Sequence, residues 1–429
     1  MNEQPFTYNQ DIIFSLFIRI QREQHNLSSK DLASATNINQ SMLSEIEHHK
    51  YNPTAKTKDT LLDYFQCHHY QQDTTFNHIA PNMNNLFLYY LNGRKDAYEY
   101  FKSLIDFEDT ELIHTNLLPF ILQLNTYFSL MATEHQLIES AFNIMNQFNF
   151  CMEPSYLLRT TFLSLLYYRK QNNLTQLDSL TVQAEKALRE FYITNDNDDY
   201  LVCALHYELI YDYIYLGKYH DAAKHLISCK KMLLQLCSYV KLPEIHLLEA
   251  YINAQKGNIS LSISQYSTMI LNASQQIPHE IILKCKNNLA WLYLMNEKYE
   301  KSIQLTNELI QEIGITTANC LNLPYCYWKL GLNGISLNHI QQSTSSITDH
   351  LHNNILKALQ IINTRQPLQI DKKQFSTIIS LFVEEAKNRN DRDFYQFTLL
   401  LASELFEAIK AYKQCTICLK RLKRLSKIS

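Results

Sequence analysis

The chain has 429 residues, of which 46% are hydrophobic and 19% are charged, and its formal net charge is −3. These proportions exclude a disordered chain, and the charge gives no global indication of nucleic acid or an acidic membrane as a partner. A chain of this length predicts two or more domains, or a small domain attached to a repeat array.

Glycine is scarce, with six residues in 429, so few tight turns or hairpins are available. Long segments with a 3.6-residue apolar period are separated by short polar breaks, which predicts an all-α chain. The ten cysteines are scattered through these segments, as in proteins of the reducing cytoplasm. No signal-peptide pattern and no apolar run of membrane-spanning length is present, so we expect a cytoplasmic protein without a membrane partner.

The first predicted element is a helix that starts near Asp11, and a second, well-capped helix follows it. Ser28 has the position of an N-cap, and Asp31 follows in capping-box spacing. Asn37 lies at the next turn, where the backbone is often left-handed and asparagine is tolerated. Asn39 is expected to cap a third helix, and a fourth helix closes this N-terminal unit.

The stretch "LSSKDLASATNINQSMLSEIEHHKYNP", residues 27–53, resembles the helix-turn-helix of the phage-repressor (XRE-like) class. Two residues depart from that pattern, Ser29 in place of glutamine and Glu45 where a basic residue is common. An amphipathic helix pair without a DNA role is the alternative. The positions in register are Leu27, Ser28, Leu32, Ala33, Gln40, Leu43, Ser44, Ile46, Glu47 and Pro53.

The resemblance implies a DNA site in which the third helix enters the major groove. Glu47 would pair with Arg22 as a structural ion pair and would not repel DNA. Helix N-terminal amides and a few lysines would hold the phosphates. The DNA-binding candidates are Ser28, Asn39, Gln40, Ser41, Ser44, Lys50, Lys56 and Lys58.

The charge balance of this segment predicts dimerisation. Residues 10–65 contain six basic and seven acidic side chains, so a single copy should bind DNA weakly. Two copies on a two-fold DNA site would compensate, as is usual for this motif. We therefore expect a homodimer on double-stranded operator DNA.

The remainder of the chain contains a repeat with a period of 40 residues. It aligns "LGKYHDAAKHL" at 216–226, "KGNISLSISQY" at 256–266 and "NEKYEKSIQLT" at 296–306. A large residue followed three positions later by a small one is typical of tetratricopeptide repeats, and random helical packing is the less favoured alternative. The pairs are Tyr219 with Ala222, Ile259 with Ser262, and Tyr299 with Ser302.

Weaker copies extend the repeat in both directions, which predicts a degenerate solenoid over residues 82–426. A fourth copy places Ile340 and Ser343 in its turn, after Tyr327, Leu330 and Gly331. The remaining copies pair Leu137 with Ser140, Leu174 with Leu177, and Tyr412 with Cys415.

A helix-turn-helix domain followed by a tetratricopeptide-like repeat array resembles the peptide-pheromone receptors of Gram-positive bacteria, the Rap, Rgg, NprR, PlcR and PrgX group. The resemblance implies a quorum-sensing transcriptional regulator that holds a short signalling peptide inside the repeat superhelix. Phage arbitrium receptors share this plan. A Rap-like anti-activator or phosphatase of a response regulator is the alternative of a different class. The predicted division is a DNA-binding domain at 1–66, a linker at 67–85 and a repeat domain at 86–429.

The peptide site is expected on the first helices of the repeats, where aromatic rings and amides suit the apolar and polar groups of a peptide. Each of these side chains has core packing as its alternative role. The candidates are Tyr207, Tyr211, Tyr251, Gln255, Asn287, Trp291, Tyr325 and Trp328.

No catalytic or cofactor motif is found, and we expect neither enzyme activity nor a cofactor. The spacing of Cys67, His68, His69 and His78 fits no standard zinc pattern, so no metal site is predicted. Cys415 and Cys418 form a C-x-x-C without a redox-type context.

Overall fold

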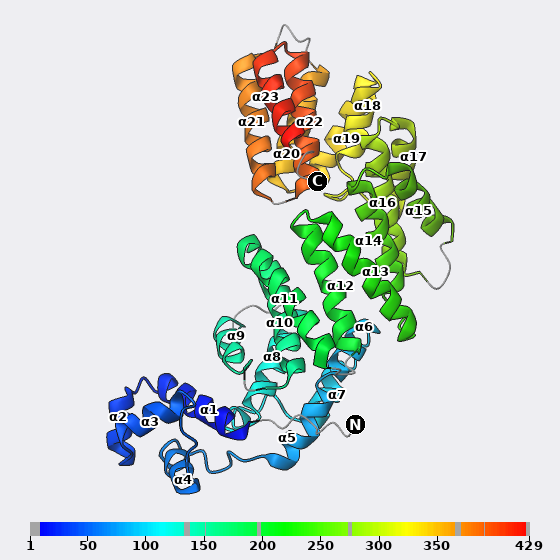
Figure 1. The fold of residues 1–429 in the computed structure, drawn as a ribbon. Coiled ribbons are helices and arrows are strands. Elements are labelled where there is room, and N and C mark those ends of the chain that lie inside the picture. Colours follow the sequence, from blue (N-terminus) through cyan, green and yellow to red (C-terminus); the bar gives the residue numbers. More distant parts are fainter. Residues whose placement is uncertain are drawn as a thin grey trace. The chain divides into compact units, whose positions relative to one another are not determined.

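The computed structural model describes residues 9–132, 138–150, 152–194, 199–272, 277–364, 370–389 and 391–425. Every regular element in these ranges is a helix (Figure 1), which confirms the predicted all-α class. None of the described helices is long and apolar enough to cross a membrane.

The chain divides into two compact units. The first comprises Met1–Asp212 and Ile227–Lys241, and the second comprises Tyr213–Leu226 and Leu242–Ser429. This division does not test the predicted boundaries at residues 66 and 85, which stay predictions.

Four helices form the N-terminal domain: α1 (Gln10–Gln24), α2 (Ser29–Thr36), α3 (Gln40–Glu47) and α4 (Ala55–Tyr64). The predicted capping box is present, because the Asp31 amide donates to Ser28 Oγ at 3.1 Å and the Ser28 amide donates to Asp31 Oδ2 at 3.1 Å. Asn37 has a φ of 61°, the left-handed turn that its position predicted. Leu43 and Ile46 are fully buried and fix α3 against α1 and α2.

The rest of the first unit contains parts of the next two helices, residues 199–212 and 227–235, and the elements α5 (Asp73–Ile79), η1 (Ala80–Asn82), α6 (Asn85–Leu91), α7 (Ala97–Leu104), η2 (Leu112–His114), α8 (Leu118–Ala132), α9 (Ile138–Gln147), α10 (Pro154–Lys170) and α11 (Leu174–Thr194). Tyr70 joins the N-terminal domain to these helices. Its ring packs on Phe14 and Phe17, with centroid distances of 5.4 and 4.8 Å. The main-chain N–H of Asn116 donates to Tyr70 O at 2.9 Å, and Asn116 Oδ1 accepts from the main-chain N–H of Gln72 at 3.0 Å.

Eight described helices follow: α12 (Asp199–Tyr215), α13 (Tyr219–Gln235), α14 (Leu242–Gln255), α15 (Ile259–Leu271), α16 (His279–Met295), α17 (Tyr299–Ile313), α18 (Asn322–Lys329) and α19 (Asn333–Ser346). Within the second unit α14 packs with α15, α16 with α17, and α18 with α19. The large residue of each 40-residue repeat is the first residue of α13, α15 or α17. The small residue three positions later is completely buried in all three helices. At Ser262 the hydroxyl also donates to Ala250 O on the preceding helix at 2.7 Å, so a large side chain would separate the two helices.

The predicted turn of the fourth copy is wrong. Ile340 and Ser343 lie inside α19, whose first residue, Asn333, is 34 positions after Tyr299. The small residue is Ser336, whose hydroxyl donates to Pro324 O at 2.8 Å, as Ser262 does in its own repeat. The error arose because the preceding helix α18 has only eight residues, so the 40-residue spacing does not continue.

The structure describes only some of the residues predicted for the weaker repeat copies. Leu174 begins α11 with Leu177 buried beneath it, and Tyr412 begins the final helix. Leu137 lies outside the described residues, as does the side chain of Ser140.

The chain ends in α20 (His350–Thr364), α21 (Lys372–Asn388), α22 (Arg392–Ala408) and α23 (Tyr412–Leu425), each packed against the next (Figure 1). Their shared core includes the fully buried Leu351, Ile379, Phe382 and Phe397. Aromatic side chains of α16 and α18 pack on the same core, which ties this helical group to the preceding repeats.

Candidate functional site

The exposed face of α3 begins at its N-terminus. Asn39 caps the helix by accepting from the Ser41 amide at 2.8 Å through its Oδ1. Gln40 and Ser41 are exposed, and Ser44 is half-buried. Because Leu43 and Ile46 hold the opposite face in the core, these polar side chains form the surface that a major groove would meet.

Glu47 and Arg22 form a bidentate ion pair. Arg22 Nε donates to Glu47 Oε1 at 2.7 Å, and Arg22 Nη2 donates to Oε2 at 3.0 Å. The Glu47 side chain is 3% exposed and that of Arg22 is 15% exposed. The hydrogen bond to Glu47 raises the pKa of Arg22. The Glu47 carboxylate is thus neutralised inside the domain and is not presented to a DNA phosphate, whereas Glu45 of the same helix is exposed.

The remaining DNA-binding candidates differ in exposure and in whether another side chain already pairs with them. Lys50 and Lys56 are exposed and form no ion pair among the described residues. Lys58 is half-buried and donates to Asp11 Oδ1 at 2.5 Å, so its charge is already compensated. The Ser28 hydroxyl donates to Asp31 Oδ2 at 2.6 Å, which lowers the pKa of Asp31.

Two adjoining cavities of about 390 and 350 Å³ lie in the second unit. They share Tyr251 and the carboxylate Asp393, together with side chains of α16. Both volumes fall within the range of about 300–1,000 Å³ usual for ligand sites. Four predicted peptide-binding residues line one or both cavities: Tyr251, Gln255, Asn287 and Trp291.

The other four predicted peptide-binding residues line neither cavity. Tyr325 is buried, packs on Phe397 and donates to Glu404 Oε2 at 3.0 Å, and Trp328 packs beside it. Tyr325 is a core residue of the second unit and the half-buried Trp328 packs against that core, the alternative role that the sequence left open.

Tyr207 and Tyr211 belong to the first unit. The Lys241 ammonium lies 4.9 Å from the centroid of the Tyr207 ring, and the Arg169 guanidinium lies 5.6 Å from that of Tyr211. Arg169 also pairs with the buried carboxylates Glu208 and Asp212, at 2.8 Å to the latter. Burial raises the pKa of Asp212 to about 7. The two tyrosines thus border a buried ionic network.

The cavities include residues that sequence reasoning missed, chiefly on α22. Asp393 Oδ2 accepts from Tyr251 Oη at 2.5 Å and from Gln255 Nε2 at 2.7 Å. Burial raises the pKa of Asp393 to about 6. Asn288 and Phe394 complete the lining around it. Asp393 follows the α22 N-cap Asp391 by two positions, which gives it no recognisable motif.

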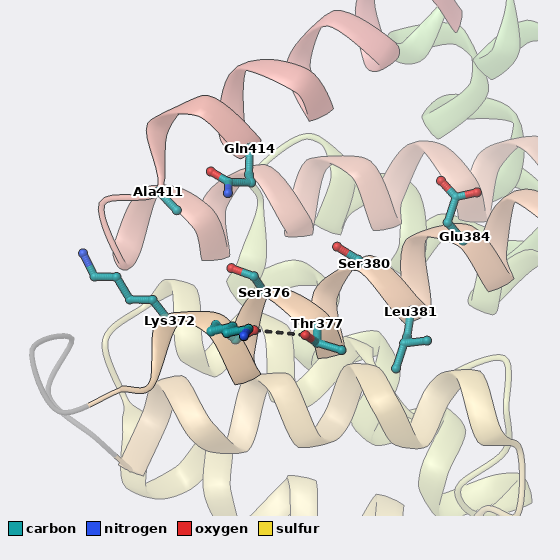
Figure 2. Close-up of a pocket in the computed structure, with 9 residues that line it drawn as sticks. Lys372, Ser376, Thr377, Ser380, Leu381, Glu384, Ala411 and Gln414 are labelled. Carbon is teal, nitrogen blue, oxygen red and sulfur yellow. Dashed lines mark hydrogen bonds between the residues drawn. The ribbon is translucent and has the colours of Figure 1, made fainter.

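A larger hollow of about 750 Å³ lies between α21 and α23 (Figure 2). Lysine, serine and threonine side chains of α21 line most of it, and most of its lining residues are exposed. Leu381 and Ala411 are its apolar members. It is an open groove, and none of the described residues that line it is aromatic, unlike those of the two smaller cavities.

Comparisons with known proteins bear on the N-terminal domain and on the fold of the chain. Residues 18–71 match the helix-turn-helix family HTH_3. The N-terminal domain is a helix-turn-helix domain. The search of curated proteins found no match to the chain.

Three solved structures share its fold at low identity. The apo form of the quorum sensor NprR from B. thuringiensis is 12% identical, with a TM-score of 0.60 over 80% of this chain and 98% of that one. A Rap protein complexed with Competence and Sporulation Factor is 13% identical, with a TM-score of 0.64 over 82% and 98%. Aspartyl phosphate phosphatase F from Bacillus subtilis is 11% identical, with a TM-score of 0.52 over 80% and 93%. The predicted resemblance to the NprR and Rap group is confirmed in domain type and in fold.

Proposed function

We propose that this protein is a cytoplasmic quorum-sensing transcriptional regulator that binds operator DNA as a homodimer and is switched by a short signalling peptide. The observation that carries the proposal is the presence, in one chain, of a helix-turn-helix domain and a repeat array with an amide- and aromatic-lined cavity. The first part suits DNA and the second suits an extended peptide.

On the DNA side, Asn39, Gln40, Ser41 and Ser44 would contact base edges, and the amides at the start of α3 and of α2 at Ser28 would contact phosphates. The Asn39 Oδ1 is occupied by capping, so its Nδ2 is the group left for a base. Lys50 and Lys56 would add phosphate contacts, whereas the charge of Lys58 is already paired with Asp11. Few free cations per copy favour two copies on a two-fold site.

On the peptide side, Asn287 and Asn288 offer amides beside the indole of Trp291 in one cavity wall. An asparagine amide both donates and accepts, so it forms paired hydrogen bonds with a peptide main chain. The aromatic rings would cover apolar side chains of the peptide. A peptide that prefers one arrangement of the protein changes its DNA affinity, and a tenfold change requires about 1.4 kcal/mol of coupling.

The test uses purified full-length protein and fragmented genomic DNA, sequenced after capture with and without the peptide fraction of spent medium. We expect a few sites with two-fold symmetry to be enriched, and the peptide fraction to change their occupancy. The Gln40→Ala variant is the matched control, because it alters the exposed face of α3 and leaves the core unchanged. Enrichment that is uniform across the genome, or identical for wild type and variant, would contradict the proposal.

The fold similarity to an aspartyl phosphate phosphatase favours a second candidate, a Rap-like protein that acts on a phosphorylated response regulator or blocks it. In that case the chain would enrich no DNA site and would bind a response regulator instead. A phage arbitrium-type receptor would behave as the first proposal does, and the identity of the enriched sites would distinguish it.

A further inference from the structure

The carboxylate of Asp393 is only half satisfied within the cavities that it lines. Its Oδ2 accepts two hydrogen bonds, from Tyr251 and Gln255. Its Oδ1 is shielded from solvent and accepts no hydrogen bond from the described residues. Both donors to Oδ2 are neutral groups, so they orient the carboxylate without cancelling its charge.

The basic side chains around Asp393 are held by other groups. Arg389 pairs with Asp349 at 2.8 Å and with Glu385 at 3.0 Å. His352 lies against the same Asp349, with Nδ1 2.6 Å from Oδ1.

Arg392 is the nearest cation along the chain. It donates to the main-chain oxygens of Gly217 and Leu425, and its guanidinium carbon lies 5.8 Å from the centroid of the Tyr219 ring. Its field offsets part of the charge of Asp393, while Asp391 adds to that charge. The described residues therefore leave Asp393 without an ion-pair partner.

The walls beside Asp393 suit the stem and the charge of an organic cation. Trp291 and Phe394 stack with an interplanar angle of 22° and centroids 6.5 Å apart, and both line the same cavity as Asp393. Aromatic faces attract ammonium and guanidinium groups and pack against their methylene stems. A carboxylate with aromatic neighbours is a common way to hold such a group.

We propose that Asp393 anchors a positively charged group of the signalling peptide, either its N-terminal ammonium or a lysine or arginine side chain. This inference rests on the proposed function, since it assumes that the cavity holds a peptide. The cation would supply the partner that the desolvated carboxylate lacks, and a peptide without one would leave the charge uncompensated. Asp393 therefore selects among peptides, while the amides of Asn287 and Asn288 hold any main chain.

The test measures retention of synthetic heptapeptides, randomised at every position, on immobilised full-length protein at pH 7.5. One pool has free N-termini and the other is N-acetylated, and retained peptides are identified by mass spectrometry. The variants are Asp393→Asn, which keeps the shape and an acceptor for Tyr251, and Glu407→Gln, an exposed position of the same helix. A wild-type thermal midpoint or higher for Asp393→Asn shows that this variant is folded.

We expect one of two results for wild type and Glu407→Gln. Either the retained peptides are enriched in lysine or arginine at one position, or peptides with free N-termini are retained and their N-acetylated counterparts are not. The first result assigns the cation to a side chain and the second assigns it to the N-terminus. Asp393→Asn should reduce that enrichment at least tenfold. Retention that is independent of any cation, or unchanged in Asp393→Asn, overturns the role of Asp393 and leaves the proposed function standing. If wild type retains no peptide from either pool, peptide binding itself is refuted, and this inference with it.

Discussion

Replacing Glu47 with alanine should loosen the helix-turn-helix domain while the repeats stay folded. The substitution leaves the Arg22 guanidinium without its bidentate partner in a largely buried position. Breaking a buried pair in this way costs about 3–5 kcal/mol. Arg22 would keep its hydrogen bond to Leu27 O at 2.9 Å and its 3.7 Å contact with Glu23, and its side chain is 15% exposed. We therefore expect the lower end of the range, about 3 kcal/mol.

Hydrogen exchange on the full-length protein is the suitable assay, because a two-unit chain has no single free energy of unfolding. A loss of about 3 kcal/mol in local opening free energy accelerates exchange of the protected amides of α1 to α3 roughly 100-fold. Peptides from the second unit should exchange at the wild-type rate. Glu45→Ala, at an exposed position of the same helix, is the control and should leave exchange unchanged. Wild-type protection of α1 to α3 in Glu47→Ala would refute the structural role of the pair.

Three further outcomes follow from the same structure. Gln40→Ala should lower specific DNA affinity by about 1–3 kcal/mol in a gel-shift titration at fixed salt, with an unchanged thermal midpoint because the side chain is exposed. Asn287→Ala should reduce retention of the heptapeptide pool while DNA binding by the free protein stays intact; equal retention would remove Asn287 from the site. The pKa of Asp393 is about 6 in the folded chain, above its ordinary value of 3.8, so its stabilising contribution is complete below pH 4 and is lost as the pH rises through 6. Asp393→Asn should therefore stabilise the second unit at pH 7.5 by up to about 3 kcal/mol, which raises the thermal midpoint of that unit, and should leave the midpoint unchanged near pH 4. A lower midpoint than that of wild type at pH 7.5 would contradict this.

The pH dependence of Asp393 can be assigned because the surrounding ionisable groups are known. They are Asp391 and Arg392 beside it on the chain, Tyr219, Tyr251 and Tyr266 from α13, α14 and α15, and His352 and Arg389, which line one of the same cavities. Comparing wild type with Asp393→Asn at each pH cancels the contribution of these groups, since both proteins contain them.

The helix-turn-helix domain was largely determined by local sequence. The capping box of Ser28 and Asp31 and the left-handed turn at Asn37 depend on residues a few positions apart, so spacing alone predicted them. The same holds for the repeat, because Ser262 and its equivalents must be small wherever two helices approach closely. That regularity failed at α19, where a short preceding helix changed the register.

The two cavities of the second unit were decided by the tertiary structure. Four of the predicted aromatic and amide residues line them, but Tyr325 is buried in the core and Trp328 packs against it, and an aromatic residue on a repeat helix has the same pattern in either role. Asp393 comes from a helix more than a hundred residues beyond Tyr251, and only their contact gives its carboxylate a place in the site. Helical periodicity states which face of a helix is buried, because burial repeats every 3.6 residues. It does not state which distant helix covers that face, because the packing of non-neighbouring helices depends on the shapes of all the side chains between them.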